Sequence, residues 1–248
     1  MIKQIPNIIT SLNLLCGCVA VMFAMSGELV TASFFAFLGI FFDFFDGLAA
    51  RVLNASSKVG LELDSLADMV TSGVVPGFVM VQLLSYSITG DYLNITEVFS
   101  ENSWNEGLVQ YLPFVGLLIV IASGYRLAKF NVDTRQTTSF IGLPTPANTL
   151  LILSLPLILA FQQTEMITGI ILNTWVLIGL TILSCILLNA EIPLFALKFK
   201  TWDLKGNAIR YVFLLISAIG LFFFHFLAIP VIILLYILLS LFWKEISD

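Results

Sequence analysis

The sequence has little charge: Asp, Glu, Lys and Arg make up 11% of its 248 residues, whereas hydrophobic residues make up 59%. A soluble domain of this size needs a polar surface, and this chain has too few polar residues to form one. The mean hydropathy of +1.02 and the long apolar runs instead predict an all-α, polytopic membrane bundle, with residues 1–248 forming one domain. A β-barrel would show short alternating segments, which this sequence does not have.

Cysteine and basic tails are also scarce. The three cysteines, Cys16, Cys18 and Cys185, lie in apolar stretches, so neither disulfides nor thiolate metal ligation are expected. No basic tail indicates nucleic-acid binding. The lone histidine, His225, lies within FFFHFL, and we interpret it as a residue of the membrane interface. The start, MIKQIPNIIT, lacks a small-residue cleavage site, and we interpret it as part of a retained first helix.

The apolar runs predict eight membrane spans. All eleven basic residues then fall on the side of the two termini, while the opposite loops carry acidic residues and no Lys or Arg. Because cytoplasmic loops are enriched in Lys and Arg, we expect both termini in the cytoplasm and the protein in the cell membrane. The predicted spans are 8–26, 29–51, 61–89, 107–130, 146–163, 167–189, 207–225 and 227–243.

Aromatic residues are expected near the membrane interface at Trp202, Tyr211 and Trp243. The segment 191–206 mixes aromatic and basic residues, so it is either an amphipathic interfacial stretch or a solvated loop.

Four aspartates lie near the cytoplasmic ends of the second and third predicted spans. Asp43 and Asp46 are three residues apart, and Asp64 and Asp68 are four apart, so each pair shares one helix face. A short turn joins the two helices, which predicts that the two acidic faces meet. Carboxylates within a span are costly and repel each other. Oxygen ligands of this kind favour Mg²⁺ or Mn²⁺, and a pair of ions can hold phosphoryl oxygens during displacement.

Small residues accompany the aspartates. Gly47 and Ala50 share a face with Asp43, and Gly60 shares one with Asp64. They either leave room for a ligand or allow close helix packing in the membrane. Glu62 lies off the acidic face and is not expected to bind metal.

The stretch from Asp43 to Arg51, followed by Gly60 to Asp68, reads DxxDGxxAR, a spacer, then GxxxDxxxD. This pattern resembles the signature of the CDP-alcohol phosphotransferases. The resemblance implies that an alcohol attacks a CDP-linked lipid and releases CMP, and that the enzyme is a homodimer. The resemblance also implies roles for individual residues: Asp43, Asp46 and Asp64 as metal ligands, Asp68 as the last ligand and general base, and Gly47, Ala50, Arg51 and Gly60 as the lining of the CDP pocket.

Two further segments bear on the alcohol. PNIITSLNLLCG, with Asn7, Thr10 and Asn13 every third residue, resembles the opening of the phosphatidylserine synthases within this family. Asn7 could instead cap the first helix. Relatives that use phosphorylated acceptors tend to have Arg at the position of Asn13.

The segments YRLAKFN and GLPTP also resemble those synthases, although Lys129 stands where Arg is usual. Arg126 or Lys129, and less so Arg135, would then hold the carboxylate of serine. The alternative is that these residues only anchor the helix end at the interface.

The resemblance thus predicts CDP-diacylglycerol and L-serine as substrates. Another acceptor stays open, such as glycerol 3-phosphate, an inositol phosphate or choline, and so does an isoprenoid CDP-lipid donor. A divalent-cation transporter would also use intramembrane aspartates. A transporter needs a polar path to the far side, and the outer half of the second span, VTASFFAFLGIFF, offers few ligands.

Overall fold

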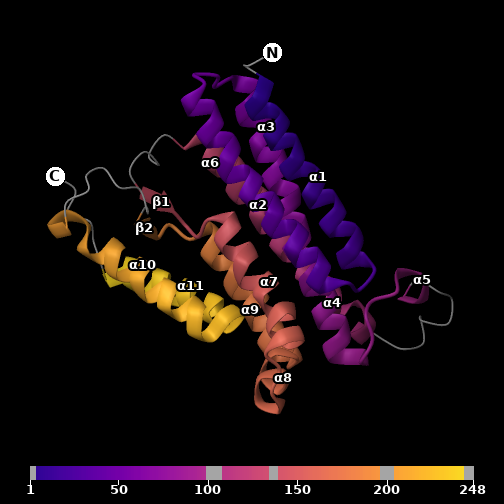
Figure 1. Ribbon diagram of the computed structural model, residues 1–248. Coiled ribbons are helices and arrows are strands. Elements are labelled where there is room, and N and C mark those ends of the chain that lie inside the picture. The colour runs from indigo at the N-terminus through magenta and orange to yellow at the C-terminus, as the bar shows by residue number, and fades with distance from the viewer. Residues whose placement is uncertain (1–3, 99–107, 134–138, 196–203, 243–248) are drawn as a thin grey trace.

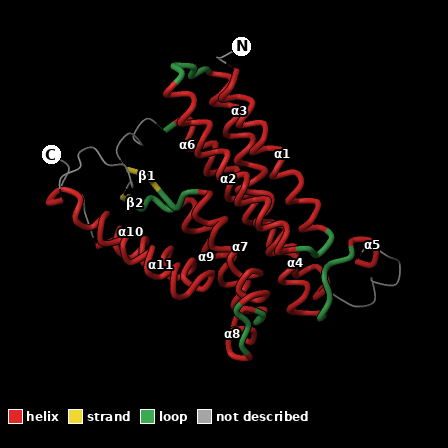
Figure 2. Tube along the Cα trace, in the orientation of Figure 1, coloured by secondary structure: helices red, strands yellow, loops and turns green. Residues whose placement is uncertain are grey.

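The protein is a bundle of long helices, described here from a computed structural model covering residues 4–98, 108–133, 139–195 and 204–242 (Figures 1 and 2). The remaining residues, including Arg135, Trp202, Trp243 and half of the segment 191–206, lie outside the described part. The helices are α1 (Ile5–Met25), α2 (Leu29–Val52), α3 (Lys58–Asp68), α4 (Val75–Thr89), α5 (Ile95–Val98), α6 (Leu118–Val132), α7 (Thr145–Phe161), α8 (Glu165–Ile171), α9 (Thr174–Asn189), α10 (Leu204–Phe224) and α11 (Ala228–Phe242).

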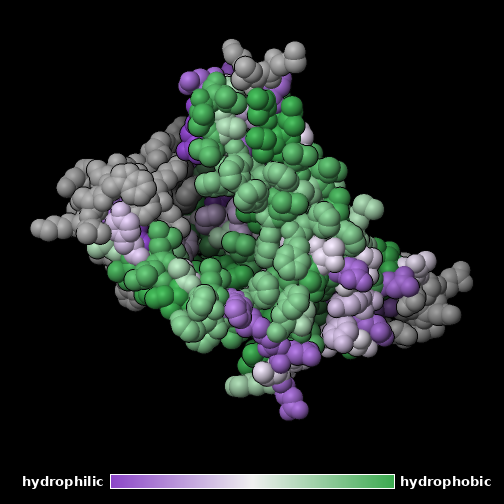
Figure 3. Space-filling view, viewed as in Figure 1, coloured by the Kyte–Doolittle hydropathy of each residue, from purple (hydrophilic) through white to green (hydrophobic). Residues whose placement is uncertain are grey.

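The bundle is apolar outside as well as inside, as a membrane protein must be. On α2, Phe41, Phe44 and Phe45 are 55%, 65% and 38% exposed, whereas Asp46 is 6% exposed. The phenylalanines of FFDFFDG therefore face outward while an aspartate turns inward. Figure 3 shows hydrophobic side chains over the flank of the bundle and hydrophilic ones gathered towards its ends.

The helices correspond to the predicted spans, and the fourth, fifth and sixth spans differ locally from straight membrane-spanning α-helices. By length and composition, five helical segments of the described chain can cross a membrane, or six if α8 and α9 form one span. These two helices are bent by 56° relative to each other, so the sixth predicted span is not one straight helix. The fourth span begins as a 3₁₀ helix, Leu108–Leu117, before α6. At 17 residues, α7 is about 25 Å long, slightly short of a typical hydrocarbon core.

The apolar stretch 210–241 is two helices rather than one. The rings of Phe213 on α10 and Tyr236 on α11 have centroids 5.8 Å apart, although 23 residues separate them in sequence. One continuous helix would place them about 35 Å apart. The reversal occurs at a 3₁₀ turn, His225–Leu227, where His225 takes a φ of 45°. The boundary predicted between the spans 207–225 and 227–243 is confirmed.

The third predicted span is not a uniform α-helix. A π-helical segment, Met69–Val74, separates α3 from α4 and begins directly after Asp68. Such wide turns are frequent at functional sites. Beyond it, α4 is almost wholly buried at the centre of the bundle, from Val75 to Ser85 except Phe78. Small residues bring α1 and α2 close together, since Ala20, Ala24, Ala32 and Ala36 are fully buried.

A short ribbon joins two connections on the side where α6 ends. The strands β1 (Ser139–Ile141) and β2 (Pro193–Phe195) pair antiparallel, with Phe140 opposite Leu194. Next to it, the amide of Leu143 donates to the carbonyl of Leu187 at 2.8 Å. The ribbon fixes the entry of α7, and the sequence analysis did not predict it.

Candidate active site

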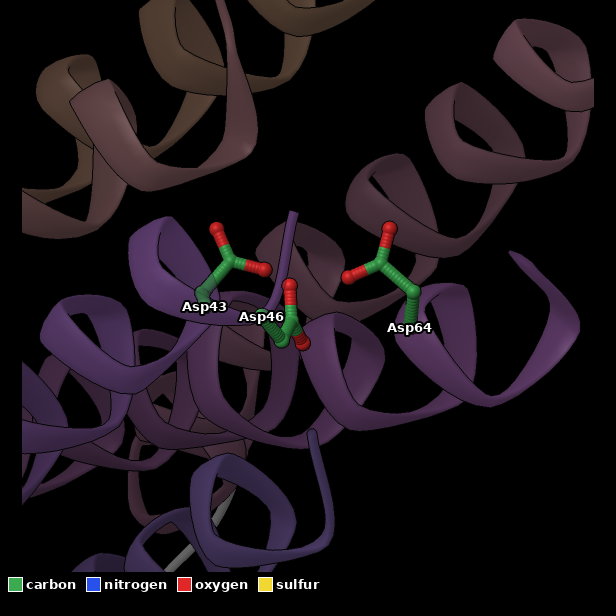
Figure 4. Close-up of side chains that lie close together, drawn as sticks. All are labelled: Asp43, Asp46 and Asp64. Atoms are coloured by element: carbon green, nitrogen blue, oxygen red, sulfur yellow. The ribbon is translucent and has the colours of Figure 1, made fainter. Parts of the chain in front are cut away.

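Three carboxylates converge where α2 and α3 lie side by side. Asp43 and Asp46 come from α2 and Asp64 from α3, and one oxygen of each lies within 4.8 Å of the others. Figure 4 shows the Asp43 and Asp64 side chains facing each other with Asp46 between them. No described basic side chain forms a salt bridge with any of the three. The predicted meeting of the two acidic faces is therefore confirmed.

This arrangement fits a divalent cation. Carboxylate oxygens are the ligands that Mg²⁺ and Mn²⁺ prefer. Three partly buried carboxylates without a positive partner repel each other, and a cation among them would offset that repulsion. The donor set is therefore chemically suited to the predicted metal.

A hydrogen bond from the first helix holds Asp46. The Thr10 hydroxyl, itself only 3% exposed, donates to Asp46 Oδ2 at 2.5 Å. The same hydroxyl lies 3.0 Å from the Pro6 carbonyl oxygen one turn earlier. Thr10 thus orients a carboxylate of the cluster from outside it.

Asp68 lies one turn beyond Asp64 and outside the group of three. Its Oδ1 accepts a long hydrogen bond, 3.4 Å, from Nδ2 of the fully buried Asn13. The Thr71 hydroxyl donates to the Asn13 carbonyl at 3.2 Å, which ties the π-helical segment to α1. Asn13 therefore positions Asp68, and the predicted metal contact of Asp68 stays a prediction.

A cavity of about 370 Å³ opens beside the cluster, within the usual size range of ligand pockets. Among the described residues predicted to bind the CDP-lipid or its acceptor, all but three line this cavity. Those three, Asn13, Arg126 and Lys129, do not line it. The lining residues that the sequence predicted as site residues are Asn7, Thr10, Asp46, Gly47, Ala50, Arg51, Gly60 and Asp64. The lining residues that it did not predict are Pro6, Ala55, Ser56, Ser57 and Leu61.

The missed residues sit mainly in the turn between α2 and α3. Ser57 caps α3, because its hydroxyl accepts a hydrogen bond from the Gly60 amide at 3.0 Å. A serine three residues before the predicted site glycine is a capping signal that could have located this edge of the cavity. Asn7 does not cap α1, which begins at Ile5; its amide donates to Gln4 at 3.0 Å.

The two site glycines have different roles. A Cβ on Gly60 would lie 2.9 Å from Asn7 Oδ1, so this glycine allows α3 to pack against α1. A Cβ on Gly47 would meet nothing within 4 Å. Packing therefore explains Gly60 but not Gly47, which faces open space in the cavity.

The comparison with known proteins agrees with this geometry. The model of the CDP-alcohol phosphatidyltransferase family matches residues 3–187, a range that includes the cluster and the cavity. The chain belongs to the CDP-alcohol phosphatidyltransferase family. It is therefore an enzyme, and the transporter alternative is set aside.

Several relatives of this phosphatidyltransferase carry a more specific name. A CDP-diacylglycerol–serine O-phosphatidyltransferase of Bacillus subtilis is 38% identical over 148 residues, covering 58% of this chain and 70% of the relative. One from Helicobacter pylori is 30% identical over 215 residues, covering 84% and 79%. An archaetidylserine synthase of Methanothermobacter thermautotrophicus is 31% identical over 146 residues, covering 57% and 53%.

The basic residues of α6 in this phosphatidyltransferase differ in their surroundings. Arg126 is 7% exposed, interacts electrostatically with Asp68 and Tyr236, and has an Nε without a hydrogen-bond partner. Lys129 instead forms a 3.2 Å salt bridge with Glu191 nearer the surface. Arg126 thus lies within electrostatic range of the predicted general base. No sequence signal linked Tyr236, from the far end of the chain, to this site.

Proposed function

We propose that this enzyme transfers the phosphatidyl group of CDP-diacylglycerol to the hydroxyl group of L-serine, giving phosphatidylserine and CMP. The observation that carries the proposal is the convergence of Asp43, Asp46 and Asp64 beside the cavity. Family membership supports phosphatidyl transfer, and the names of the relatives from Bacillus subtilis and Helicobacter pylori support serine as the acceptor.

The proposed reaction depends on Mg²⁺ or Mn²⁺, bound as a pair. Asp43, Asp46 and Asp64 would hold the ions, with Asp68 completing the set. When bound, the ions supply positive charge that neutralises the pyrophosphate of the donor and the CMP that leaves.

The chain's own residues position the reactants and move one proton. Asp68 accepts the proton of the serine hydroxyl, with Asn13 holding the carboxylate. The serine oxygen then bonds to the β-phosphorus of the donor as the bond to the CMP oxygen breaks. Arg51 lines the cavity, and its Nε donates a hydrogen bond to the Gly47 carbonyl at 3.0 Å. Its other N–H groups can donate to phosphate oxygens of the CDP-lipid.

Arg126 suits the carboxylate of serine, because its guanidinium is buried, has an unpaired Nε and lies within electrostatic range of Asp68. A phosphorylated acceptor would call for more cationic side chains, whereas Lys129 is already paired with Glu191. An isoprenoid CDP-lipid is a second candidate donor, favoured by the similarity to an archaetidylserine synthase.

We further propose that the site faces the cytoplasm of the cell. Arg51 and Lys58 flank the turn at the end of the bundle nearest the aspartates, whereas Glu28 and Glu165 lie at the other end (Figure 1). This charge distribution supports the orientation predicted from the basic residues. The homodimer implied by the family resemblance stays a prediction, and the mass of the purified protein in detergent tests it.

The deciding experiment measures CMP release by the purified enzyme in detergent with CDP-diacylglycerol and Mn²⁺ or Mg²⁺. Serine is compared with glycerol 3-phosphate, inositol phosphate and choline. We expect release that requires serine and the metal, and that is lost in Asp68→Asn. Release with another alcohol and not serine would refute the choice of acceptor. No metal-dependent release with any alcohol, from protein that is folded by its melting curve, would refute the proposed reaction.

A further inference from the structure

One asparagine of α7 lacks every hydrogen bond that its side chain could make. Asn148 is 0% exposed, and neither its Nδ2 nor its Oδ1 has a hydrogen-bond partner in the part of the chain that the structure describes. Asn148 lies outside the CDP cavity and outside the carboxylate cluster. A buried amide without partners lowers stability, because the group has lost its hydrogen bonds to water. Such a residue needs a reason other than the fold.

Other buried polar groups without partners lie on the helices that pack together around Asn148. They are Ser72 Oγ in the π-helical segment, Ser123 Oγ and Arg126 Nε on α6, and Thr145 Oγ1 on α7. We call these four residues and Asn148 the polar chamber.

The elements of the polar chamber touch each other directly. The hydroxyl of Thr149, next to Asn148, donates to the Ser72 carbonyl at 2.9 Å. A Cβ on Gly73 would lie 3.2 Å from the Cβ of Ser123. Ser72 lies one turn after Asp68, and Arg126 interacts with Asp68 electrostatically. The chamber is therefore next to the proposed general base.

The chemistry of displacement requires two separate spaces. In an in-line displacement, the attacking oxygen and the leaving oxygen lie on opposite sides of the phosphorus. The CDP cavity occupies the side of α1, α2 and the start of α3. The acceptor must then approach Asp68 from the other side, where α6, α7 and the π-helical segment meet.

We propose that Asn148 is a specificity-determining residue that binds the acceptor as a zwitterionic α-amino acid. Its Oδ1 accepts a hydrogen bond from the ammonium group, and its Nδ2 donates to the carboxylate, which Arg126 also binds. This inference rests on the proposed function, since it names a contact to the serine of that reaction. It explains why both halves of the amide are unpaired in the protein alone.

The test compares Asn148→Leu with a matched control, Asn189→Leu. Asn189 is a half-buried asparagine whose Oδ1 is also unpaired, but its Nδ2 donates to the carbonyls of Ala122 and Cys185 at 3.1 and 3.2 Å, so it makes the hydrogen bonds that Nδ2 of Asn148 lacks. Replacing an unpaired buried amide by an apolar group of similar size removes its desolvation cost. Asn148→Leu should therefore melt at or above the wild-type temperature, whereas Asn189→Leu should melt below it.

The kinetic test measures CMP release to obtain the KM for serine and the KM for CDP-diacylglycerol, and compares how much each changes in the variant. Asn148→Leu should raise the KM for serine about 10- to 100-fold, because hydrogen bonds to two charged groups are lost. The KM for CDP-diacylglycerol should change less than about twofold. The preference of the wild type for serine over 3-hydroxypropionate, which lacks the ammonium group, should shrink about tenfold or more in the variant.

The outcomes separate the two proposals. If the wild type uses another alcohol and not serine, the proposed function fails and the inference fails with it. If the wild type uses serine while Asn148→Leu keeps its KM for serine and its preference, only the inference is overturned. A lower melting temperature with an unchanged KM would show that Asn148 is structural. If Asn148→Leu does not fold, Asn148→Asp keeps the size but repels the carboxylate, and an unchanged KM for serine there also overturns the inference.

Discussion

The hydrogen bond from Thr10 to Asp46 makes a specific prediction about metal affinity. In Thr10→Val, a side chain of the same shape loses the hydroxyl that donates to Asp46 Oδ2 at 2.5 Å. Asp46, only 6% exposed, would keep its charge without the donor that orients it. We expect weaker binding of the metal and little change in the binding of serine.

The structure sets the size of this effect. A net hydrogen bond to a charged group contributes about 1.5–3 kcal/mol, which corresponds to roughly 10- to 100-fold in an equilibrium constant. Groups that orient metal ligands typically contribute about as much to affinity. The Thr10 hydroxyl also lies 3.0 Å from the Pro6 carbonyl oxygen, so part of its bonding does not depend on Asp46. We therefore expect the lower end, about tenfold.

The assay is CMP release as a function of buffered free Mn²⁺. The concentration for half-maximal activity should rise about tenfold in Thr10→Val and stay near the wild-type value in Thr10→Ser, which keeps the hydroxyl. The KM for serine at saturating Mn²⁺ should change little in either variant. If Thr10→Val folds normally and shows the wild-type dependence on Mn²⁺, then Thr10 does not support the metal site.

Three further predictions concern the cluster, the glycines and Lys129. Asp43→Asn should abolish CMP release. In EDTA it should melt at a higher temperature than the wild type, because the substitution relieves repulsion among the carboxylates. Added Mn²⁺ should raise the melting temperature of the wild type only. Gly47→Ala should melt at or slightly above the wild-type temperature, because alanine stabilises a helix relative to glycine, and should raise the KM for CDP-diacylglycerol. Gly60→Ala should melt below Gly47→Ala, because its Cβ would lie 2.9 Å from Asn7 Oδ1 on α1; equal melting curves would contradict the difference in packing. Lys129→Ala should change the unfolding free energy by less than about 1 kcal/mol, because its salt bridge with Glu191 is partly exposed. A large rise in the KM for serine in this variant would show instead that Lys129 binds the acceptor.

The sequence predicted the carboxylate cluster because helix periodicity is a local property. Spacings of three and four residues place Asp43 beside Asp46 and Asp64 near Asp68 on any regular helix. A short turn then forces the two helices to be neighbours. Gly47 and Ala50 share the face of Asp43 for the same reason, whereas the place of Arg51 in the CDP cavity was predicted only from the family resemblance.

Features that depend on long-range packing could not be predicted in this way. The π-helical segment after Asp68 has no sequence marker, since MVTSGV can also form a regular helix. Tyr236 approaches Arg126 only because the α10–α11 pair folds back on the bundle. The unpaired state of Asn148 is a property of its neighbours, and a sequence shows the amide but not the absence of partners around it.

The π-helical segment has a consequence for how this helix can change by mutation. An i→i+5 turn accommodates one more residue than an α-turn, so the faces before and after it are out of phase by about one residue, or about 100°. Asp64 and Asp68 point towards α1 and α2, while the buried face of α4 is set independently. Deleting one residue between Met69 and Val74 would turn the π-turn into an α-turn and leave the acidic face and the buried face of α4 in place. A deletion elsewhere between Asp64 and α4 would rotate one face against the other by about 100°. The π-helical segment is therefore the place where this helix can lose a residue and keep both its core and its carboxylates.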